Sequence, residues 1–273
     1  MFHRFAALVL TSVMALSVAA PAQVHTARRE AAKEVRSKLF KQVLADFPDV
    51  RECVMSEEGG AAAAEENMSA DAVDLNRDGV PEYEVGISGP CVCGMVNCSI
   101  YLYRQTADGY ELILDGASGF GLNVLKTSTN GYADVQVDAR DNAAVQNQTT
   151  YKFDGKQYRE ARSMMVHMGT GESKPAYRRI QFRRGSSSTT VQGKVSVALP
   201  DTYLLGARAG QVMTVQLTAS RKVRFMIMTS RTTESLADNT TSWTGTLPET
   251  GDYLILVDTD GEGRTYSMTI SIK

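Results

Sequence analysis

The densest group of side-chain oxygens lies in residues 74–82, which read Asp-Leu-Asn-Arg-Asp-Gly-Val-Pro-Glu. Calcium takes six or more oxygen ligands, and a tight loop turns alternate residues toward one point. The candidate ligands are the side chains of Asp74, Asn76, Asp78 and Glu82 and the backbone carbonyl of Val80. The spacing predicts a structural calcium site, and the alternative is an Asx-rich turn held by its own hydrogen bonds.

The cysteines form a second group with chemical potential: Cys53, Cys91, Cys93 and Cys98. Their spacing lacks the pattern of a zinc site, and His3, His25 and His167 are distant in sequence. We therefore expect two disulfides. Four cysteines allow three pairings, of which we favour Cys93–Cys98, closing a short loop, together with Cys53–Cys91.

Motifs of known enzyme classes are absent from the sequence. There is no Gly-x-Ser-x-Gly, no His-Glu-x-x-His and no glycine-rich phosphate loop. The hydroxyl run Ser186–Ser188 has no base near it in the sequence. We expect a binding protein and no catalytic residues.

One helix and a group of strands should position these residues. Apolar residues recur every four positions at Val35, Leu39, Val43 and Phe47, which predicts a helix over 26–47 ended by Pro48. Residues 56–70 contain few bulky apolar side chains, and we expect a mobile loop there.

Hairpin signals mark residues 71–160. Asp108-Gly109, Asn130-Gly131 and Asp154-Gly155 each separate two strand-like runs. Such dipeptides supply the positive φ angles that tight hairpin turns require. Residues 23–160 are therefore predicted to form a helix plus antiparallel β domain that contains the disulfides.

A linker is predicted at 161–177, followed by a second β domain at 178–273. Apolar residues alternate along 213–217, 225–227 and 266–272, and 253–257 is a more continuous apolar run typical of a central strand. About eight short strands in this length favour an antiparallel β-sandwich. The fold class expected for the whole chain is mostly β.

The N-terminus indicates export. Residues 1–22 comprise a basic start, an apolar run from Phe5 to Ala20 and the small-x-small site Ala20-Pro21-Ala22. This is the arrangement of a cleavable signal peptide, and the apolar run is too short for a membrane anchor. We expect a periplasmic or secreted protein without a transmembrane anchor.

The charge distribution excludes a typical nucleic-acid-binding protein. From residue 178 onward there are 12 Lys/Arg and 8 Asp/Glu, or +4, and the remaining 17 basic and 23 acidic residues give −6. Neither half has the strongly basic surface that nucleic acids require.

Two stretches resemble known families. Residues 74–82 are similar to the Asp-x-Asn-x-Asp-Gly loops of FG-GAP repeats, which join two strands. The EF-hand is excluded because its twelfth position is Val85 here. In the C-terminal half, 180–195, 201–217 and 245–253 with 266–273 resemble, in this order, the bacterial periplasmic inhibitors of g-type lysozyme, which are β-sandwiches akin to peptidase-associated domains.

The second resemblance implies a partner and two contact residues. The resemblance predicts that two residues contact lysozyme: Tyr203, in Asp-Thr-Tyr, and Arg264, in the last long loop. For Tyr203 the alternative is a buried strand tyrosine. The last loop contains one arginine beside Asp258, Asp260 and Glu262, and this favours a second hypothesis. The sandwich would then bind a glycan or an envelope protein without inhibiting an enzyme.

Overall fold

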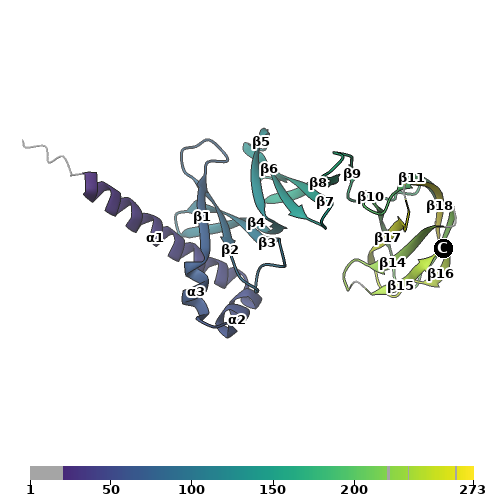
Figure 1. Cartoon of the computed structure of the whole chain (residues 1–273), viewed down its shortest axis with the longest axis horizontal. Helices are drawn as coiled ribbons and strands as arrows, with labels where there is room; N and C mark the ends of the chain where they lie inside the picture. The colour runs from purple at the N-terminus through teal and green to yellow at the C-terminus, as the bar shows by residue number, and fades with distance from the viewer. Residues whose placement is uncertain (1–20, 220–221, 233, 262) are drawn as a thin grey trace, which may run out of the picture.

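The computed structural model describes residues 21–219, 222–232, 234–261 and 263–273. These residues form three helices and eighteen strands, so the chain is mostly β, as the sequence predicts. Figure 1 shows the helices and two sheets of the first half on one side and the C-terminal sandwich on the other. The expected signal peptide, residues 1–22, lies outside the described residues except for its last two.

The first half begins with a helical layer. Helix α1 covers Pro21–Asp46, α2 covers Pro48–Ser56 and α3 covers Gly60–Glu66. Leu39, Phe40, Val43 and Leu44 are buried, so the predicted stripe of α1 is confirmed. It packs on one face of a sheet with the order β1-β2-β3-β4. The strands of this sheet are β1 Met68–Val73, β2 Glu82–Ile87, β3 Cys98–Thr106 and β4 Gly109–Gly119.

One prediction about this layer is confirmed and one is wrong. Helix α1 ends at Asp46, before Pro48, as expected, and Pro48 then begins α2, because a proline at the first helical position lacks only an N–H that has no intrahelical acceptor there. The expected mobile loop 56–70 contains α3 and the first residues of β1. Its small residues still pack, since Ala61 and Ala64 lie against the core and Met68 is buried.

The other face of this sheet packs on a second antiparallel sheet with the order β5-β6-β7-β8-β9. Its strands are β5 Gly121–Thr129, β6 Tyr132–Arg140, β7 Val145–Phe153, β8 Tyr158–His167 and β9 Ser173–Pro175. The Asn130-Gly131 turn joins β5 to β6 with φ angles of 49° and 85°, as its sequence predicts.

The expected linker 161–177 is mostly part of this second sheet. It contains the C-terminal part of β8 and all of β9. Met165 on β8 is buried in a small cluster with Val145 and with Leu199 of the sandwich. Met165 is the only buried apolar residue of 161–177, so the segment shows no regular apolar period.

The C-terminal half is a sandwich of two sheets, with strand orders β10-β12-β17-β14-β15 and β11-β18-β13-β16. All strand pairs are antiparallel except β10 with β12. The strands are β10 Arg178–Arg179, β11 Ser188–Val195, β12 Asp201–Ala207, β13 Val212–Ala219, β14 Val223–Thr229, β15 Ser235–Thr240, β16 Ser242–Thr246, β17 Gly251–Thr259 and β18 Arg264–Ile272.

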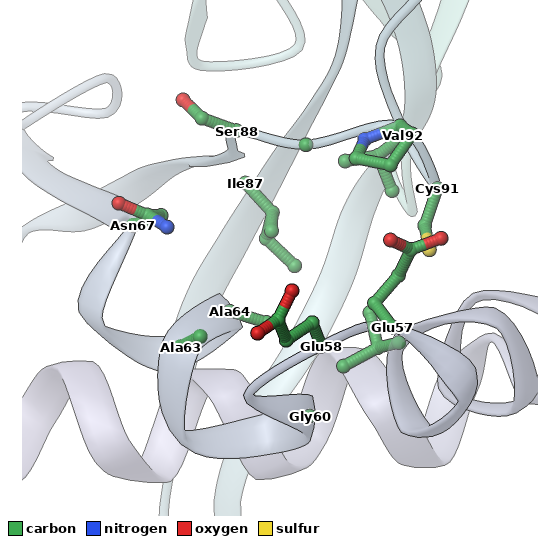
Figure 2. A pocket seen from close by; sticks show the side chains of 13 residues that line it. Glu57, Glu58, Gly60, Ala63, Ala64, Asn67, Ile87, Ser88, Cys91 and Val92 are labelled. Carbon is green, nitrogen blue, oxygen red and sulfur yellow. The ribbon is translucent and has the colours of Figure 1, made fainter.

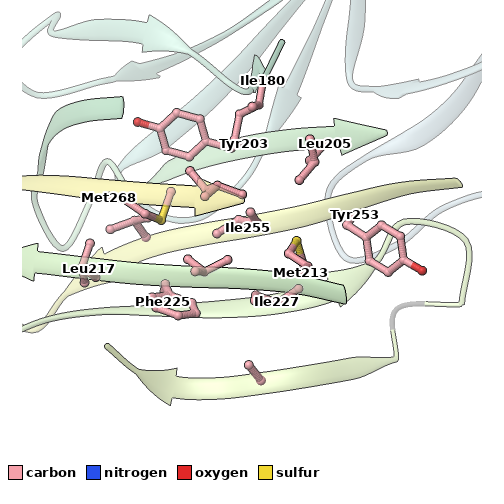
Figure 3. Close-up of a cluster of buried hydrophobic side chains, with 14 of the residues drawn as sticks. Ile180, Tyr203, Leu205, Met213, Leu217, Phe225, Ile227, Tyr253, Ile255 and Met268 are labelled. Atoms are coloured by element: carbon pink, nitrogen blue, oxygen red, sulfur yellow. The ribbon is translucent and has the colours of Figure 1, made fainter. Parts of the chain in front are cut away.

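The core of the sandwich consists of the alternating residues of both sheets. Met213, Phe225, Ile255 and Met268 point into the space between the sheets, as Figure 3 shows. Strand β17 is the central strand of its sheet, as its apolar run predicts. Packing in this core fixes the positions of the strand ends. The turns at those ends form the surface at which a partner would be contacted.

Candidate functional site

The turn between β17 and β18 lies at one end of the sandwich and brings together cations from β11, from β18 and from the turn that precedes β14. Arg264 begins β18 and pairs in register with Val195, beside Lys194 on β11. A Cβ placed on Gly263 would lie 2.7 Å from Cε of Lys194, and one on Gly261 would lie 3.6 Å from Cδ of Lys222 and 3.8 Å from Nε of Arg264. The three cationic side chains therefore surround the turn. We call this group the turn cations: Lys194, Lys222 and Arg264.

The acids of the same turn are only partly neutralised. Lys222 Nζ lies 3.7 Å from Asp260 Oδ1, and both side chains are largely exposed. Burial, followed by repulsion from Asp238, raises the pKa of Asp258. Within the described part of the chain, Lys194 and Arg264 have no carboxylate partner within 4.0 Å.

Sequence reasoning found Arg264 but missed Lys194 and Lys222. They lie far from residue 264 in sequence, and only the sheet pairings bring them to the turn. The alternation of β11 was a usable signal, since Val195 points into the core and Lys194 therefore points outward.

Tyr203 is placed differently from Arg264. Its side chain is 2% exposed, which favours the alternative that it is a buried strand tyrosine. Its hydroxyl lies 2.6 Å from the hydroxyl of Tyr266 and accepts a hydrogen bond of 2.7 Å from Arg178 Nη2. The guanidinium carbon of Arg178 also lies 4.6 Å from the ring centroid of Tyr203, so Arg178 covers this tyrosine.

A buried carboxylate completes this network. Asp201 Oδ2 accepts a hydrogen bond of 2.5 Å from Tyr266, and its two oxygens pair with Arg178 and Lys174 at 2.7 and 2.9 Å. Burial raises the pKa of both Tyr203 and Tyr266, so each remains a neutral donor. A Cβ on Gly193 would lie 2.2 Å from Asp201 Oδ2, so only glycine fits there. The network is structural, because its groups are satisfied by one another.

The loop that follows β1 forms the hydrogen-bonded Asx turn that is the alternative to a calcium site. Asp74 accepts hydrogen bonds from the backbone N–H groups of Arg77 and Gly79 at 2.7 and 3.2 Å. Asp78 Oδ1 accepts one from Val80 N–H at 2.7 Å. Gly79 has a φ of 84°, and Arg77 shares the left-handed region at 63°. The Asx-turn hydrogen bonds are therefore present.

The remaining candidate ligands are tied into the fold. Asn76 donates to the hydroxyl of Tyr132 on β6 at 3.1 Å. Glu82 is 3% exposed and accepts a hydrogen bond from Leu75 N–H at 2.8 Å, and burial raises the pKa of its carboxyl group. Among the described residues, the carboxylates of Asp74, Asp78 and Glu82 do not come within 4.8 Å of one another as a group. Calcium binding would therefore draw them inward, and it stays a prediction.

The disulfides form as favoured from the sequence. Cys53 of α2 is bonded to Cys91, and Cys93 is bonded to Cys98. No free cysteine is present in the described chain. Two disulfides are consistent with an oxidising compartment outside the cytoplasm. No helix among the described residues has the length and apolarity needed to cross a membrane.

A pocket of about 130 Å³ lies beside the Cys53–Cys91 disulfide, between α2, α3 and residues 87–92. Figure 2 shows Glu57 next to Cys91, with Glu58 and Ala64 below the loop that carries Ser88. The walls are largely apolar and the two carboxylates are exposed. Both cysteines are oxidised, so the pocket presents no nucleophile from them.

No family model matches the chain, and no curated protein sequence matches it. Among solved structures, it is similar to PliG of Aeromonas hydrophila, a periplasmic inhibitor of g-type lysozyme, with 29% identity and a TM-score of 0.34 over 36% of this chain and 96% of that one. PliG of Salmonella Typhimurium gives 23% identity and 0.30 over 35% and 96%. The pre-peptidase C-terminal domain of Bacillus anthracis collagenase gives 17% and 0.28 over 36% and 94%.

These three likenesses extend over about a third of the chain and concern β-sandwich architecture. They do not bear on the FG-GAP resemblance of residues 74–82. Fold and site together define a disulfide-bonded, mostly β protein with a helix-covered first half and a C-terminal sandwich.

Proposed function

We propose that this chain is an exported binding protein whose C-terminal sandwich inhibits a g-type lysozyme and so protects peptidoglycan. The observation that carries the proposal is the position of the turn cations. Lys194 and Arg264 stand exposed at a strand-end turn, and neither has a carboxylate partner within 4.0 Å among the described residues. The resemblance of residues 180–273 to periplasmic lysozyme inhibitors supports the same partner.

The chemistry of the partner explains why such a turn would bind. Glycosidase clefts contain carboxylates, and a narrow turn with cations complements them. A guanidinium can pair with a carboxylate through two parallel hydrogen bonds, which gives Arg264 the geometry of an anchor. Tyr203 is not part of the proposed contact, because its hydroxyl is held by Arg178 and Tyr266.

The first test measures turnover of peptidoglycan by a g-type lysozyme in the presence of the purified mature chain. We expect inhibition at or below micromolar concentration. Because anchors of this kind typically contribute about 2 kcal/mol or more, Arg264→Ala should weaken inhibition roughly 30-fold, and Lys194→Ala should weaken it in the same direction. Asp258→Asn should strengthen it by removing a repelling charge.

Arg208→Ala is the matched control. Arg208 is exposed at the turn after β12, at the opposite end of the strands. Its backbone N–H donates to Gln211 Oε1 at 2.8 Å and its carbonyl accepts from Gln211 N–H at 3.2 Å, and the substitution leaves both backbone groups in place. It should leave inhibition unchanged. Full lysozyme activity at micromolar wild-type chain would eliminate the inhibitor proposal.

A second function is favoured by one observation: the turn also contains the exposed acids Asp258 and Asp260. A turn of mixed charge suits a polar glycan or an envelope protein better than a purely anionic cleft. Co-sedimentation of the mature chain with insoluble peptidoglycan tests this alternative. Binding that persists without any inhibition would favour it.

A further inference from the structure

The loop closed by the Cys93–Cys98 disulfide is held rigidly at its base. Gly94 N–H donates to the carbonyl of Asn97 at 2.8 Å, closing the loop across its tip. The Asn97 amide then binds the backbone of Arg140 on β6 twice, with Nδ2 donating to its carbonyl and Oδ1 accepting from its N–H, each at 2.8 Å. The disulfide and these hydrogen bonds therefore restrain the backbone on both sides of Met95 and Val96.

The side chains at the tip are apolar and exposed. Met95 is 103% exposed and Val96 is 52% exposed, although neither is polar. Nothing in the loop requires them for its own packing, since the disulfide and Asn97 hold it. Exposed apolar side chains that gather on a surface mark interaction sites.

Two further exposed apolar residues meet the same arginine. Phe120 and Met168 are each 49% exposed. The guanidinium carbon of Arg140 lies 6.0 Å from the ring centroid of Phe120, and Nη1 of the same arginine contacts the sulfur of Met168. We call this surface the Arg140 patch: Met95, Val96, Phe120, Met168 and Arg140.

Arg140 has no anionic partner among the described residues, although two aspartates lie within two residues of it in sequence. Asp138 accepts hydrogen bonds from Gln136 and Asn123 at 2.8 and 2.9 Å. Asp141 accepts one from Asn142 at 3.1 Å. Arg140 is half-buried as a residue, and the interactions of its guanidinium within the described chain are with a thioether and an aromatic ring. A carboxylate is the group that would satisfy it best.

A hollow of about 570 Å³ opens beside the loop, lined by Met95, Val96, Ser118, Arg140, Asp141 and Asn142 among others. This volume holds a few side chains of a partner. A rigid, pre-formed surface also lowers the ordering cost of binding. A lipid surface would require several cations, whereas the patch offers one.

We propose that the Arg140 patch is a second binding surface, separate from the sandwich, that takes an apolar peptide segment of a partner protein with an Asp or Glu beside its apolar residues. The apolar side chains would cover Met95 and Val96, and the carboxylate would pair with Arg140. This surface does not depend on the proposed inhibition of lysozyme.

The experiment selects heptapeptides from a random phage-displayed library on the immobilised mature chain. Enriched peptides should combine Leu, Ile, Phe or Met with an Asp or Glu. As synthetic peptides they should bind the wild type saturably and lose about 10-fold or more in affinity on Met95→Asp and on Arg140→Gln.

The matched control is Met55→Asp, which makes the same change at an exposed methionine of α2, outside the patch. It should leave peptide binding unchanged, and circular dichroism should confirm that all variants fold. No enrichment, enriched peptides without an acid, or binding that Met95→Asp leaves unchanged would each overturn the proposal. So would a wild-type dimer in sedimentation velocity that Met95→Asp abolishes, because the patch would then bind a second copy.

Discussion

At the scale of single residues, the structure separates two positions that a sequence resemblance groups together. Arg264 is exposed at the β17–β18 turn, whereas Tyr203 is buried beneath Arg178. The resemblance assigns a type of residue to a place along the chain, but exposure depends on what packs over that place. Here the covering residue comes from β10, outside the segments that carry the Tyr203 match.

The loop 74–82 gives a prediction at this scale. Millimolar calcium should raise the melting temperature of the chain, because an ion that binds only the folded state stabilises it by mass action. Asp78→Asn should remove that increase while keeping the acceptor for Val80 N–H. Thermal unfolding with and without calcium measures both effects.

The control is Asp154→Ala, which removes the acceptor for Lys156 and Gln157 N–H in another Asx turn. It should lower stability but leave the calcium response intact. A melting temperature that calcium does not change would leave residues 74–82 as a turn and nothing more.

At the scale of elements, the short strand β10 shows how a two-residue element is fixed to the sandwich. It pairs in parallel with β12, and Arg179 forms two hydrogen bonds with Asp252 at the start of β17, at 2.8 and 2.7 Å. These hydrogen bonds lower the pKa of Asp252. The parallel pairing alone is too short to hold the strand.

Asp252→Asn should therefore destabilise the sandwich at pH 7. The pair is partly exposed, so the expected loss is at most about 1 kcal/mol. Because the folded-state pKa of Asp252 lies below its unfolded value, the stabilisation is present above roughly pH 4 and is lost as the pH falls through the folded-state pKa.

Urea unfolding, followed by the fluorescence of Trp243, measures the free energy of unfolding of the wild type and the variant. Trp243 is the only tryptophan and lies on β16. The difference between variant and wild type should shrink as the pH falls below about 4. Asp260→Asn, whose pair with Lys222 is longer at 3.7 Å, should have a smaller effect. An equal difference at pH 7 and pH 3 would contradict the role of the charge.

At the scale of the whole molecule, the two halves are joined by a polar and an apolar contact. Lys174 on β9 donates to the carbonyl of Leu199 at 2.6 Å and pairs with the buried Asp201. Val145 and Met165 of the second sheet pack on Leu199. Burial lowers the pKa of Lys174 despite the ion pair. The two halves should therefore unfold together.

Lys174→Ala tests this coupling. It leaves the carbonyl of Leu199 without its donor and Asp201 with one cation, which should cost about 1–3 kcal/mol. Calorimetry should show one transition in the wild type and two separated transitions in the variant. Lys156→Ala, at the exposed turn between β7 and β8, should keep the single transition. A wild type that already unfolds in two steps would contradict the prediction.

The sequence by itself determined the elements whose signals are local. The stripe of α1, the Asn-Gly and Asp-Gly turns and the alternating strands of the sandwich were predictable, because helix period, strand period and turn φ depend on near neighbours in the chain. The Asx hydrogen bonds of residues 74–82 have the same local origin. The favoured disulfide pairing was confirmed, although spacing alone left two other pairings open.

Only the tertiary structure decided which residues share a surface. Lys194 and Lys222 join Arg264 through strand pairing, Arg140 collects Met95, Phe120 and Met168 from separate segments, and Tyr203 is covered by Arg178. The segments 56–70 and 161–177 form regular structure because distant residues pack on them. Such contacts depend on how sheets pair and layers pack, and no local pattern of residues encodes them.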